Sequence, residues 1–484
     1  MLKMLRSVGA LYNPLALSHT LVYMLQSVEY SPGQYLQWFW RTKDFAAVAR
    51  RRTLRVTRVA KLLHYFLSVG LLVQSISVAT WLIYAFASGH GEQTFFALAL
   101  LASSPIVWAH VVLIPLMLGN YFVIRPQRTR QAAMVQQAFD KHSGTKIAIA
   151  GSYGKTSMKE ILATVLGEGL KVAATPANMN VVSSHARFAR SLKGNENVVL
   201  VEFGEGKPGD VKMFTRLVQP THAVVTGLAP AHLDQYKTVQ AAGEDIFCVT
   251  KNLPASQVFV NTESRKTAAF MKDGFIGYSR EQVGAYTVSH QHTDLHGTQF
   301  KLHYGTKTID CQSGLVGLHH IGPLAAAAML CLELGLTEKQ LKTGLAKTIP
   351  YEHRMQPYRL NGAWVIDDTY NGNLEGIRAG TALLQSLSGK RKLYVTPGLV
   401  EQGKNTARIH EEVGQLIAAA NPDIVVLMNN STTPHIKRGL AQTKNFTGEI
   451  IVQDDPLDFY SHLADFVAAG DIVLLQNDWT DNYA

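Results

Sequence analysis

The chain has 484 residues, of which 47% are hydrophobic and 17% are charged. This length allows about three domains, and the composition excludes an intrinsically disordered chain. A formal net charge of +10 predicts an anionic partner, which could be lipid headgroups, nucleotide phosphates or nucleic acid.

The first 40 residues are apolar but interrupted. Residues 9–30 contain Pro14, His19 and Glu29, and residues 35–43, YLQWFWRTK, are aromatic and basic. We predict a membrane-surface helix followed by an interfacial aromatic patch, with a third spanning helix as the alternative. No small-residue cleavage site follows a short apolar core, which argues against a cleaved signal peptide.

Two later stretches are long enough to cross a bilayer. Residues 62–88 and 95–123 contain no Asp, Glu, Lys or Arg, and a short polar turn separates them. Basic residues flank both stretches: Arg41, Lys43, Arg50, Arg51, Arg52, Arg55, Arg58 and Lys61 before them, and Arg125, Arg128 and Arg130 after them. This distribution follows the positive-inside rule better than it fits a nucleic-acid surface, so we predict no nucleic-acid partner.

The prediction is therefore a multi-pass protein of the cytoplasmic membrane, with membrane lipid as a partner and everything after residue 125 in the cytoplasm. Two buried core helices of a soluble protein are the alternative. We divide the chain into a membrane region 1–125, a linker helix 126–143, a central domain 144–348 and a C-terminal domain 349–484.

Residues 145–160, TKIAIAGSYGKTSMKE, predict a strand, a phosphate-binding loop and a helix. Gly151 and Gly154 allow successive N–H groups to point at phosphate oxygens, and Lys155 adds positive charge. Thr156 is a natural hydroxyl ligand for phosphate-bound Mg²⁺. Ser152 and Ser157 complete the predicted loop. The general G-x-x-x-x-G-K-[ST] pattern fails at Ile149, so a purely structural glycine-rich turn is the alternative.

The remaining sequence alternates strand and helix patterns, which predicts mostly parallel sheets covered by helices. Residues 275–313 predict a small antiparallel insert in the central domain, and the α/β pattern restarts at residue 364. Helices are expected near 320–335 and 337–347. The three cysteines, Cys248, Cys311 and Cys331, lie apart in apolar contexts and indicate reduced core thiols.

Three further residues could belong to the nucleotide site. Glu202 ends an apolar strand, where ligands bind in open α/β sheets, and it can hold Mg²⁺. His232 follows another apolar strand, and Lys251 falls on a predicted helix. The alternatives are a surface glutamate, a structural histidine and a solvated lysine.

Several stretches together resemble the Mur ligase family, the ATP-dependent amide ligases of peptidoglycan synthesis. They occur in the family's order over residues 145–475: GSYGKTS, TPANMN (175–180), VEFGEGKPGD (201–210), VVTGLAPAHLDQYKTVQ (224–240), the lysine of VTKNLP, EHRM (352–355), IDDTYNGNLEGI (366–377) and PGLVEQGKNTARIHEEVG (397–414). The last three stretches are most similar to the member that adds D-alanyl-D-alanine to UDP-muramoyl-tripeptide. The resemblance implies a P-loop central ATPase domain and a Rossmann-like C-terminal domain.

The resemblance also implies a role for each matching residue. Lys155 and Thr156 would hold the ATP phosphates and Mg²⁺, and Glu202, His232 and a carbamylated Lys251 would ligate the magnesium. In the C-terminal domain the implied residues are Arg354 near the γ-phosphate, Asp367 or Asp368 at the ribose and Asn371 in the loop that closes over the nucleotide. The implied reaction forms an acyl phosphate that an amine then attacks.

The chain departs from the family pattern in three places. In the adenine-contacting segment, GLHHIGP (317–323), His320 and Pro323 replace the expected asparagines. The C-terminal LLQNDWTDNYA lacks the family's Lys-Gly-Ser type ending. Membrane helices take the place of the family's UDP-binding domain, so we expect a cell-wall precursor that is UDP-linked or undecaprenyl-linked.

The expected activity is a membrane-anchored ligase that joins this precursor to an amino acid or dipeptide, in contact with other envelope-synthesis proteins. One alternative is a ligase similar to poly-γ-glutamate or folylpolyglutamate synthetase. The other is a non-catalytic membrane scaffold for envelope enzymes.

Overall fold

The computed structural model describes residues 9–28, 30–42, 45, 48, 56–177, 179–229, 233–370, 372–399, 402 and 405–477. The chain forms two compact units, one up to Thr129 and one from Arg130 onward. The division falls inside helix α8 (Arg125–Lys141), where the sequence predicts a linker helix.

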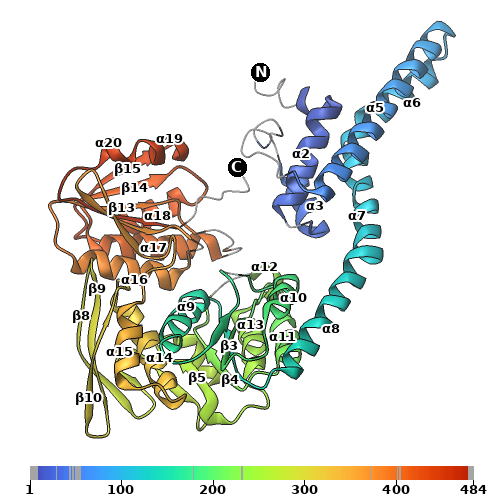
Figure 1. Ribbon diagram of the computed structural model, residues 1–484. Coiled ribbons are helices and arrows are strands. Elements are labelled where there is room, and N and C mark those ends of the chain that lie inside the picture. Colours follow the sequence, from blue (N-terminus) through green and yellow to red (C-terminus); the bar gives the residue numbers. More distant parts are fainter. Residues whose placement is uncertain are drawn as a thin grey trace. The chain divides into compact units, whose positions relative to one another are not determined.

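The N-terminal unit is a helical hairpin with shorter helices packed on one half of it (Figure 1). Its elements are α2 (Pro14–Ser27), α3 (Pro32–Arg41), α5 (Arg58–Ala87), α6 (Gly91–Val111), α7 (Leu113–Gly119), the π-helical turn η1 (Asn120–Ile124) and the start of α8. The two apolar stretches predicted from the sequence are therefore helices. Helix α2 has 14 residues, fewer than the roughly 20 that a spanning helix requires.

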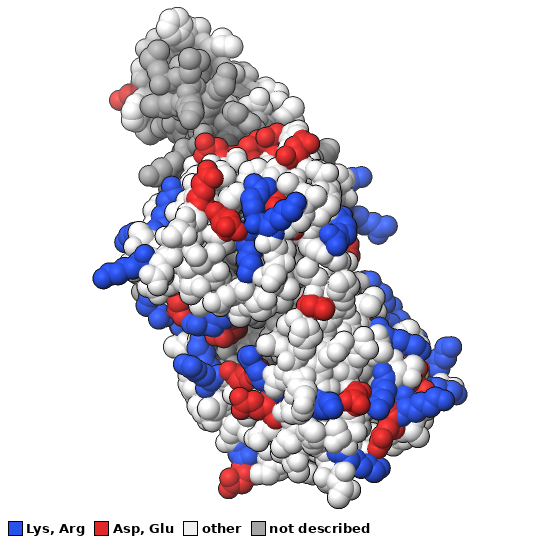
Figure 2. All heavy atoms as spheres, turned by 90° about the vertical axis from the view of Figure 1, so that its left-hand side faces the viewer, with Lys and Arg blue, Asp and Glu red and all other residues white. Residues whose placement is uncertain are grey.

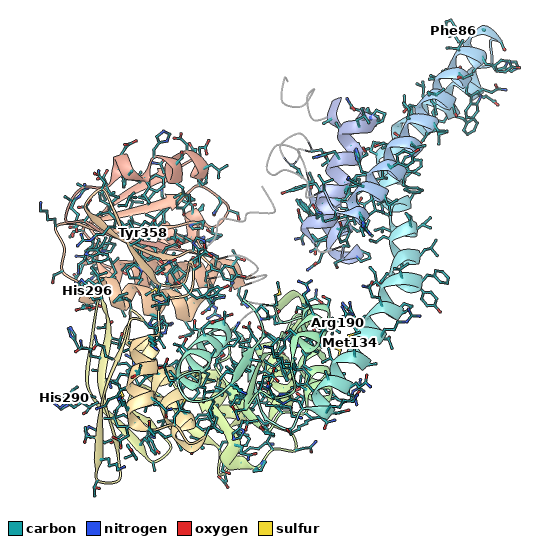
Figure 3. All side chains as sticks on the ribbon, in the orientation of Figure 1. Phe86, Met134, Arg190, His290, His296 and Tyr358 are labelled. Atoms are coloured by element: carbon teal, nitrogen blue, oxygen red, sulfur yellow. The ribbon has the colours of Figure 1, made fainter. Side chains whose placement is uncertain are left out.

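The two halves of α5 lie in different surroundings. In its first half Leu63, Leu67 and Leu71 are buried in a core shared with α2, α3, α6 and α7. Ser18 of α2 and Ser68 of α5 are joined by a 2.9 Å hydrogen bond there. The second half exposes most of its large apolar side chains, including Phe86, which is 85% exposed near the end of the hairpin (Figure 3).

The second unit begins with a ten-stranded sheet in the order β10-β9-β8-β7-β6-β5-β4-β1-β3-β2. The strands are β1 (Thr145–Ala150), β2 (Val172–Ala174), β3 (Val198–Glu202), β4 (His222–Val225), β5 (Val258–Asn261), β6 (Ile276–Tyr278), β7 (Gln282–Val283), β8 (Tyr286–Asp294), β9 (Gly297–Tyr304) and β10 (Lys307–Ser313). The helices are α9 (Lys155–Leu166), α10 (Val182–Ser191), α11 (Asp210–Val218), α12 (Leu233–Tyr236), α13 (Val239–Ile246), α14 (Ile321–Glu333), α15 (Glu338–Ala346) and the 3₁₀ helices η2 (Phe247–Thr250), η3 (Ala255–Gln257), η4 (Arg265–Phe270) and η5 (Leu318–His320).

The predicted antiparallel insert 275–313 is only partly right. β6 pairs in parallel with β5, since η4 carries the chain across to it. Only β7 to β10 are antiparallel, and they extend the central sheet itself. On the face that carries β8 to β10, Figure 2 shows Lys and Arg interspersed with Asp and Glu, as on an ordinary water-facing surface.

Alternate residues of the buried strands face opposite layers of helices. Ile147 and Ile149 of β1 pack with α9 and α14, whereas Ala148 and Ala150 pack with α10 and α11. Helix α8 covers the second layer through Phe139, and Met134 of α8 meets Arg190 of α10 (Figure 3). Both faces are covered, which explains why these strands read as continuous apolar runs.

The C-terminal part of this unit has a six-stranded sheet in the order β11-β12-β16-β13-β14-β15. Its strands are β11 (Gln356–Leu360), β12 (Ala363–Asp368), β13 (Lys392–Thr396), β14 (Ile424–Met428), β15 (Glu449–Gln453) and β16 (Ile472–Gln476), parallel except for β11. Its helices are α16 (Leu374–Ser386), α17 (Thr406–Ala420), α18 (Thr433–Ala441), α19 (Pro456–Ser461) and α20 (Leu463–Phe466). The two sheets together form the mixed two-domain α/β architecture predicted from the sequence.

Candidate nucleotide site

The phosphate loop lies between β1 and α9 and depends on two glycines. Gly151 has φ of 143° and Gly154 has φ of 75°, in the region that side chains disfavour. A Cβ on Gly151 would lie 2.3 Å from Thr226 Oγ1, so the loop packs closely on the end of β4. The Ser152 N–H donates to the Gly227 carbonyl at 2.8 Å, which fixes the loop in front of the N-terminus of α9. Such a helix end is suited to binding an anion.

Tyr153 holds this loop from the side. Its ring packs so closely on Gly227 that a Cβ there would lie 2.4 Å from a ring carbon. Burial raises the pKa of the Tyr153 hydroxyl to about 12. A hydrogen bond with Ser264 lowers the pKa, but by less than burial raises it. The hydroxyl therefore stays protonated at neutral pH, and the loop is preorganised by packing on both sides.

Thr156 and Glu202 come together as the sequence predicts they should. Strand register pairs Ile149 with Glu202, which places the carboxylate beside the start of the phosphate loop. The Thr156 hydroxyl lies 3.2 and 3.1 Å from the two carboxylate oxygens of Glu202. Ser157 follows in the first turn of α9.

The backbone around Glu202 is held by buried polar groups. The Glu202 N–H donates to Thr175 Oγ1 at 3.1 Å, and His185 Nε2 lies 2.9 Å from the Glu202 carbonyl oxygen. Burial lowers the pKa of His185 to about 4, so its imidazole is neutral and Nε2–H is the donor. Burial also raises the pKa of Glu202, while Lys155, Lys159, Thr156 and Arg354 lower it.

Two site residues escape the sequence analysis. Lys159 is fully buried, and its ammonium lies 3.1 Å from Glu160 and 3.8 Å from Glu202 and donates to the Ala177 carbonyl. Its spacing of four residues from Lys155, on one face of a helix, is the signal that could have found it. The second is Glu205, which forms a 2.8 Å ion pair with Lys155. It lies three residues after Glu202 in the same VEFGEGK run.

Arg354 lies close enough to the site for its charge to lower the pKa of Glu202. Its guanidinium stacks on the Tyr370 ring at 4.6 Å, and its buried Nε has no hydrogen-bond partner among the described residues. Arg354 therefore has a donor available for a ligand.

The two predicted ribose ligands, Asp367 and Asp368, accept hydrogen bonds from neighbouring residues of the C-terminal part. Asp367 accepts from His353 Nδ1 at 2.7 Å and from the Thr369 hydroxyl at 2.6 Å. Asp368 accepts from the Met355 N–H at 3.2 Å and from Gln476 Nε2 at 2.9 Å. Burial raises the pKa of Asp368 to about 7. These bonds give both carboxylates a structural role in the C-terminal sheet, and their ribose role stays a prediction.

Three other predicted residues are not brought to the site by the described structure. His232 and Asn371 lie outside the described residues. Lys251 is exposed in a turn after η2, so its predicted helix is wrong, and no described hydrogen bond links it to Glu202. His320 is buried at the end of η5 with its ring 4.0 Å from that of His319. Burial and then His319 lower the pKa of His320 well below its usual range.

The donor set fits a magnesium ion bound together with phosphate. Thr156 and Glu202 offer hard oxygen ligands, and Mg²⁺ is ordinarily held by one or two carboxylates with phosphates and waters completing the shell. The described residues contain no group of three or more His, Cys, Asp or Glu that could hold a metal alone. The class defined by this fold and site is a P-loop α/β protein built to hold a nucleotide phosphate and a divalent cation.

Comparison with known proteins gives the family. The pattern of the Mur ligase middle domain matches residues 149–331, and that of the Mur ligase glutamate ligase domain matches residues 353–476. The chain belongs to the Mur ligase family.

The similar relatives share one name. The chain is 28% identical over 291 residues to the UDP-N-acetylmuramoyl-tripeptide--D-alanyl-D-alanine ligase of Buchnera aphidicola, over 58% of this chain and 62% of the relative. It is 27% identical over 289 residues to the ligase of that name from Escherichia coli, over 58% and 63%. The match thus spans less than two thirds of either relative.

Solved structures show the same fold. The MurF ligase from Thermotoga maritima, crystallised with ADP, superposes with a TM-score of 0.62 at 22% identity, over 72% of this chain and 80% of that one. MurF from Acinetobacter baumannii gives a TM-score of 0.62 at 19% identity, over 72% and 77%.

Proposed function

We propose that the chain is an ATP-dependent, ADP-forming amide ligase of cell-wall precursor synthesis. One observation carries the proposal: Lys155, Thr156 and Glu202 converge at one edge of the central sheet in a chain of the Mur ligase family. The name shared by the similar relatives favours a muramoyl peptide as the carboxylate substrate and D-alanyl-D-alanine as the amine. A single amino acid is the alternative amine.

The proposed reaction has two steps. A substrate carboxylate oxygen attacks the γ-phosphorus of ATP. The bond between the γ-phosphorus and the oxygen that bridges it to the β-phosphate breaks, so the products of this step are an acyl phosphate and ADP. The amine then attacks the acyl carbon, loses a proton, and expels inorganic phosphate from the tetrahedral intermediate. Both steps mainly need cations near developing negative charge and tight positioning, which Lys155, Arg354 and the loop N–H groups can supply.

Magnesium would be held by Thr156 and Glu202 and would neutralise phosphate charge. We retain His232 and a carbamylated Lys251 as proposed ligands. Lys251 is exposed, so CO₂ can reach its amine. Intact-protein mass spectrometry in bicarbonate would detect bound CO₂, and a Lys251→Arg variant that retains full activity would refute this part.

The ligase activity can be tested with purified protein, ATP, Mg²⁺ and a panel of amino acids and D-alanyl-D-alanine. UDP-muramoyl-peptide and its undecaprenyl-linked counterpart are offered in parallel, and products are identified by mass spectrometry. Amide product and ADP formed in equal amounts support the proposal. Faster turnover of the soluble substrate would exclude the lipid-linked version, and no product with any pair would refute the ligase assignment.

We further propose that the N-terminal hairpin anchors the chain in the cytoplasmic membrane. Helix α5 has 30 residues, or about 45 Å, and only 17% of its most apolar window is buried, unlike a soluble core helix. A second apolar helix runs from Gly91 to Lys141. Exposed Phe122, Val123 and Ile124 precede Arg125, as expected where a helix leaves the lipid.

Cysteine labelling in whole cells tests the anchor, since the native cysteines are all buried. A cysteine at Gly89, in the turn between α5 and α6, should react with a membrane-impermeant thiol reagent added outside. A matched cysteine at the exposed Lys193 should react only after permeabilisation. Equal labelling of both positions in intact cells, or release of the protein by alkaline washing, would refute the anchor.

Two alternative functions remain: a ligase similar to poly-γ-glutamate or folylpolyglutamate synthetase, and a non-catalytic membrane scaffold. Folylpolyglutamate synthetase from L. casei shares the fold, with a TM-score of 0.50 at 16% identity, so the fold does not separate the two ligases. The altered adenine segment at His320 supports the scaffold. ATP-dependent phosphate release that Lys155→Ala abolishes would exclude the scaffold, and the amine specificity would separate the ligases.

A further inference from the structure

Glu205 has no role in the reaction proposed above, yet it contacts the central cation of the site. Its side chain is almost fully buried, and its carboxylate lies 2.8 Å from Lys155 Nζ. The same ammonium donates to the Gly151 carbonyl at 2.6 Å. Both contacts occupy the lysine that would hold nucleotide phosphate.

The charges around the loop balance one another. Lys155, Lys159, Glu202 and Glu205 are buried, and the partly buried Glu160 and Arg354 add one anion and one cation, so the charges are equal in number. An uncompensated buried charge is costly, so each ion of this set depends on its partners. Glu205 also reduces the attraction of the site for an anion, because it competes with phosphate for the Lys155 ammonium.

The segment that carries Glu205 is fixed on both sides. Gly204 lies against Asn180, since a Cβ on it would come 2.5 Å from the Asn180 carbonyl oxygen. On the other side the Lys207 N–H donates to Asp210 at 3.1 Å, and the Tyr236 hydroxyl donates to the Lys207 carbonyl at 2.9 Å. The negative charge of Glu205 therefore stays near the loop when a nucleotide binds.

We propose that Glu205 is an affinity-setting residue, a built-in counter-ion of Lys155 that nucleotide phosphate must displace. It acts on the nucleotide through Lys155 and is a positioning residue. The role rests on the proposed nucleotide site and adds to it a reason for weak product binding: ADP has to displace a charge-assisted hydrogen bond, so it dissociates readily after each turnover.

Calorimetric titration of the full-length protein with ADP and Mg²⁺ tests this role. Glu205→Gln retains a hydrogen-bond acceptor but removes the charge, and it should lower the Kd for ADP about tenfold. Glu205→Asp keeps the charge on a shorter side chain and should give an intermediate Kd, which also provides a test if the glutamine variant does not fold. The matched control is Glu168→Gln, which breaks a 2.7 Å ion pair with Lys347 in the same domain and should leave the Kd unchanged.

The outcomes separate this inference from the function on which it rests. A lower Kd for ADP in the Glu205 variants, with no change in Glu168→Gln, supports Glu205 as the counter-ion of Lys155. An unchanged or increased Kd in a folded Glu205→Gln protein overturns it and leaves the nucleotide site standing. Failure of the wild-type protein to bind ADP overturns the nucleotide site and this inference together.

Discussion

The two parallel sheets of the second unit end in different ways at their carboxyl edges. At the central sheet, Lys155, Lys159, Glu202 and Glu205 form buried ion pairs around a helix N-terminus. At the C-terminal sheet, Asp368 is held by neutral partners, and Asn477 Nδ2 donates to Thr396 Oγ1 at 3.3 Å. A paired set of cations can exchange partners with phosphate, whereas a hydrogen-bonded set holds its own strand ends together. The difference assigns phosphate chemistry to the first edge.

The largest expected effect tests that assignment directly. Lys155→Ala or Glu202→Ala should lower ATP-dependent turnover by at least about a thousandfold, because the first removes a cation at the transferred phosphate and the second removes a proposed ligand of Mg²⁺. ADP release is the measurement, and circular dichroism checks that each variant is folded. The control is Glu168→Gln, which breaks an ion pair with Lys347 in the same domain and should retain turnover. Full activity in either alanine variant would refute the site.

The second prediction concerns stability at the same edge. Lys159→Met should destabilise the central domain by about 4 kcal/mol, because it leaves Glu202 with fewer partners in a buried position. Lys347→Met, which breaks an exposed pair with Glu168, should cost less than about 1 kcal/mol. Native-state hydrogen exchange of the β3 amides measures both. Equal effects would show that Lys159 is not part of a buried charge network.

Sequence reasoning predicted the architecture well because the signals are local. The apolar run of β1, the glycines and the restart of the α/β pattern at β12 each lie within a few residues. The Thr156–Glu202 contact was also predictable, since parallel strands bring their carboxyl ends to one edge.

The residues that the sequence analysis missed form ion pairs with side chains far away along the chain. Lys159 looks like an exposed helix lysine until Glu202 and Ala177 are placed beside it. Glu205 looks like a loop carboxylate until Lys155 reaches it, across 50 residues of chain. The sequence predicts Asp368 only as a ribose ligand and shows no sign of the hydrogen bonds that it accepts from Met355 and Gln476.

The third prediction uses pH to probe the central edge. The folded pKa of His185 is about 4 against an ordinary 6.5, so the fold favours the neutral ring. Its contribution is fully present above pH 6.5 and is lost as the pH falls through 4, by about 3 kcal/mol. Hydrogen exchange of β3 between pH 7 and pH 4 measures the loss, and His185→Gln should flatten this pH dependence. An equally steep loss in that variant would assign it to other groups.

The smallest effect has the opposite sign and belongs to the C-terminal edge. Asp368 has a folded pKa of about 7 against an ordinary 3.8, so the fold favours the protonated carboxyl. Its contribution is complete below pH 3.8 and is lost as the pH rises through 7. Asp368→Asn resembles the protonated form in shape, and it should stabilise the C-terminal domain at pH 8 by about 1 kcal/mol, less than the pKa shift alone implies because the amide group cannot accept at both positions. The gain should disappear by pH 4, as followed by hydrogen exchange of β12 and β16.

A variant that is less stable than the wild type at pH 8 would show that the two hydrogen bonds accepted by Asp368 require its charge. The C-terminal edge would then resemble the central one.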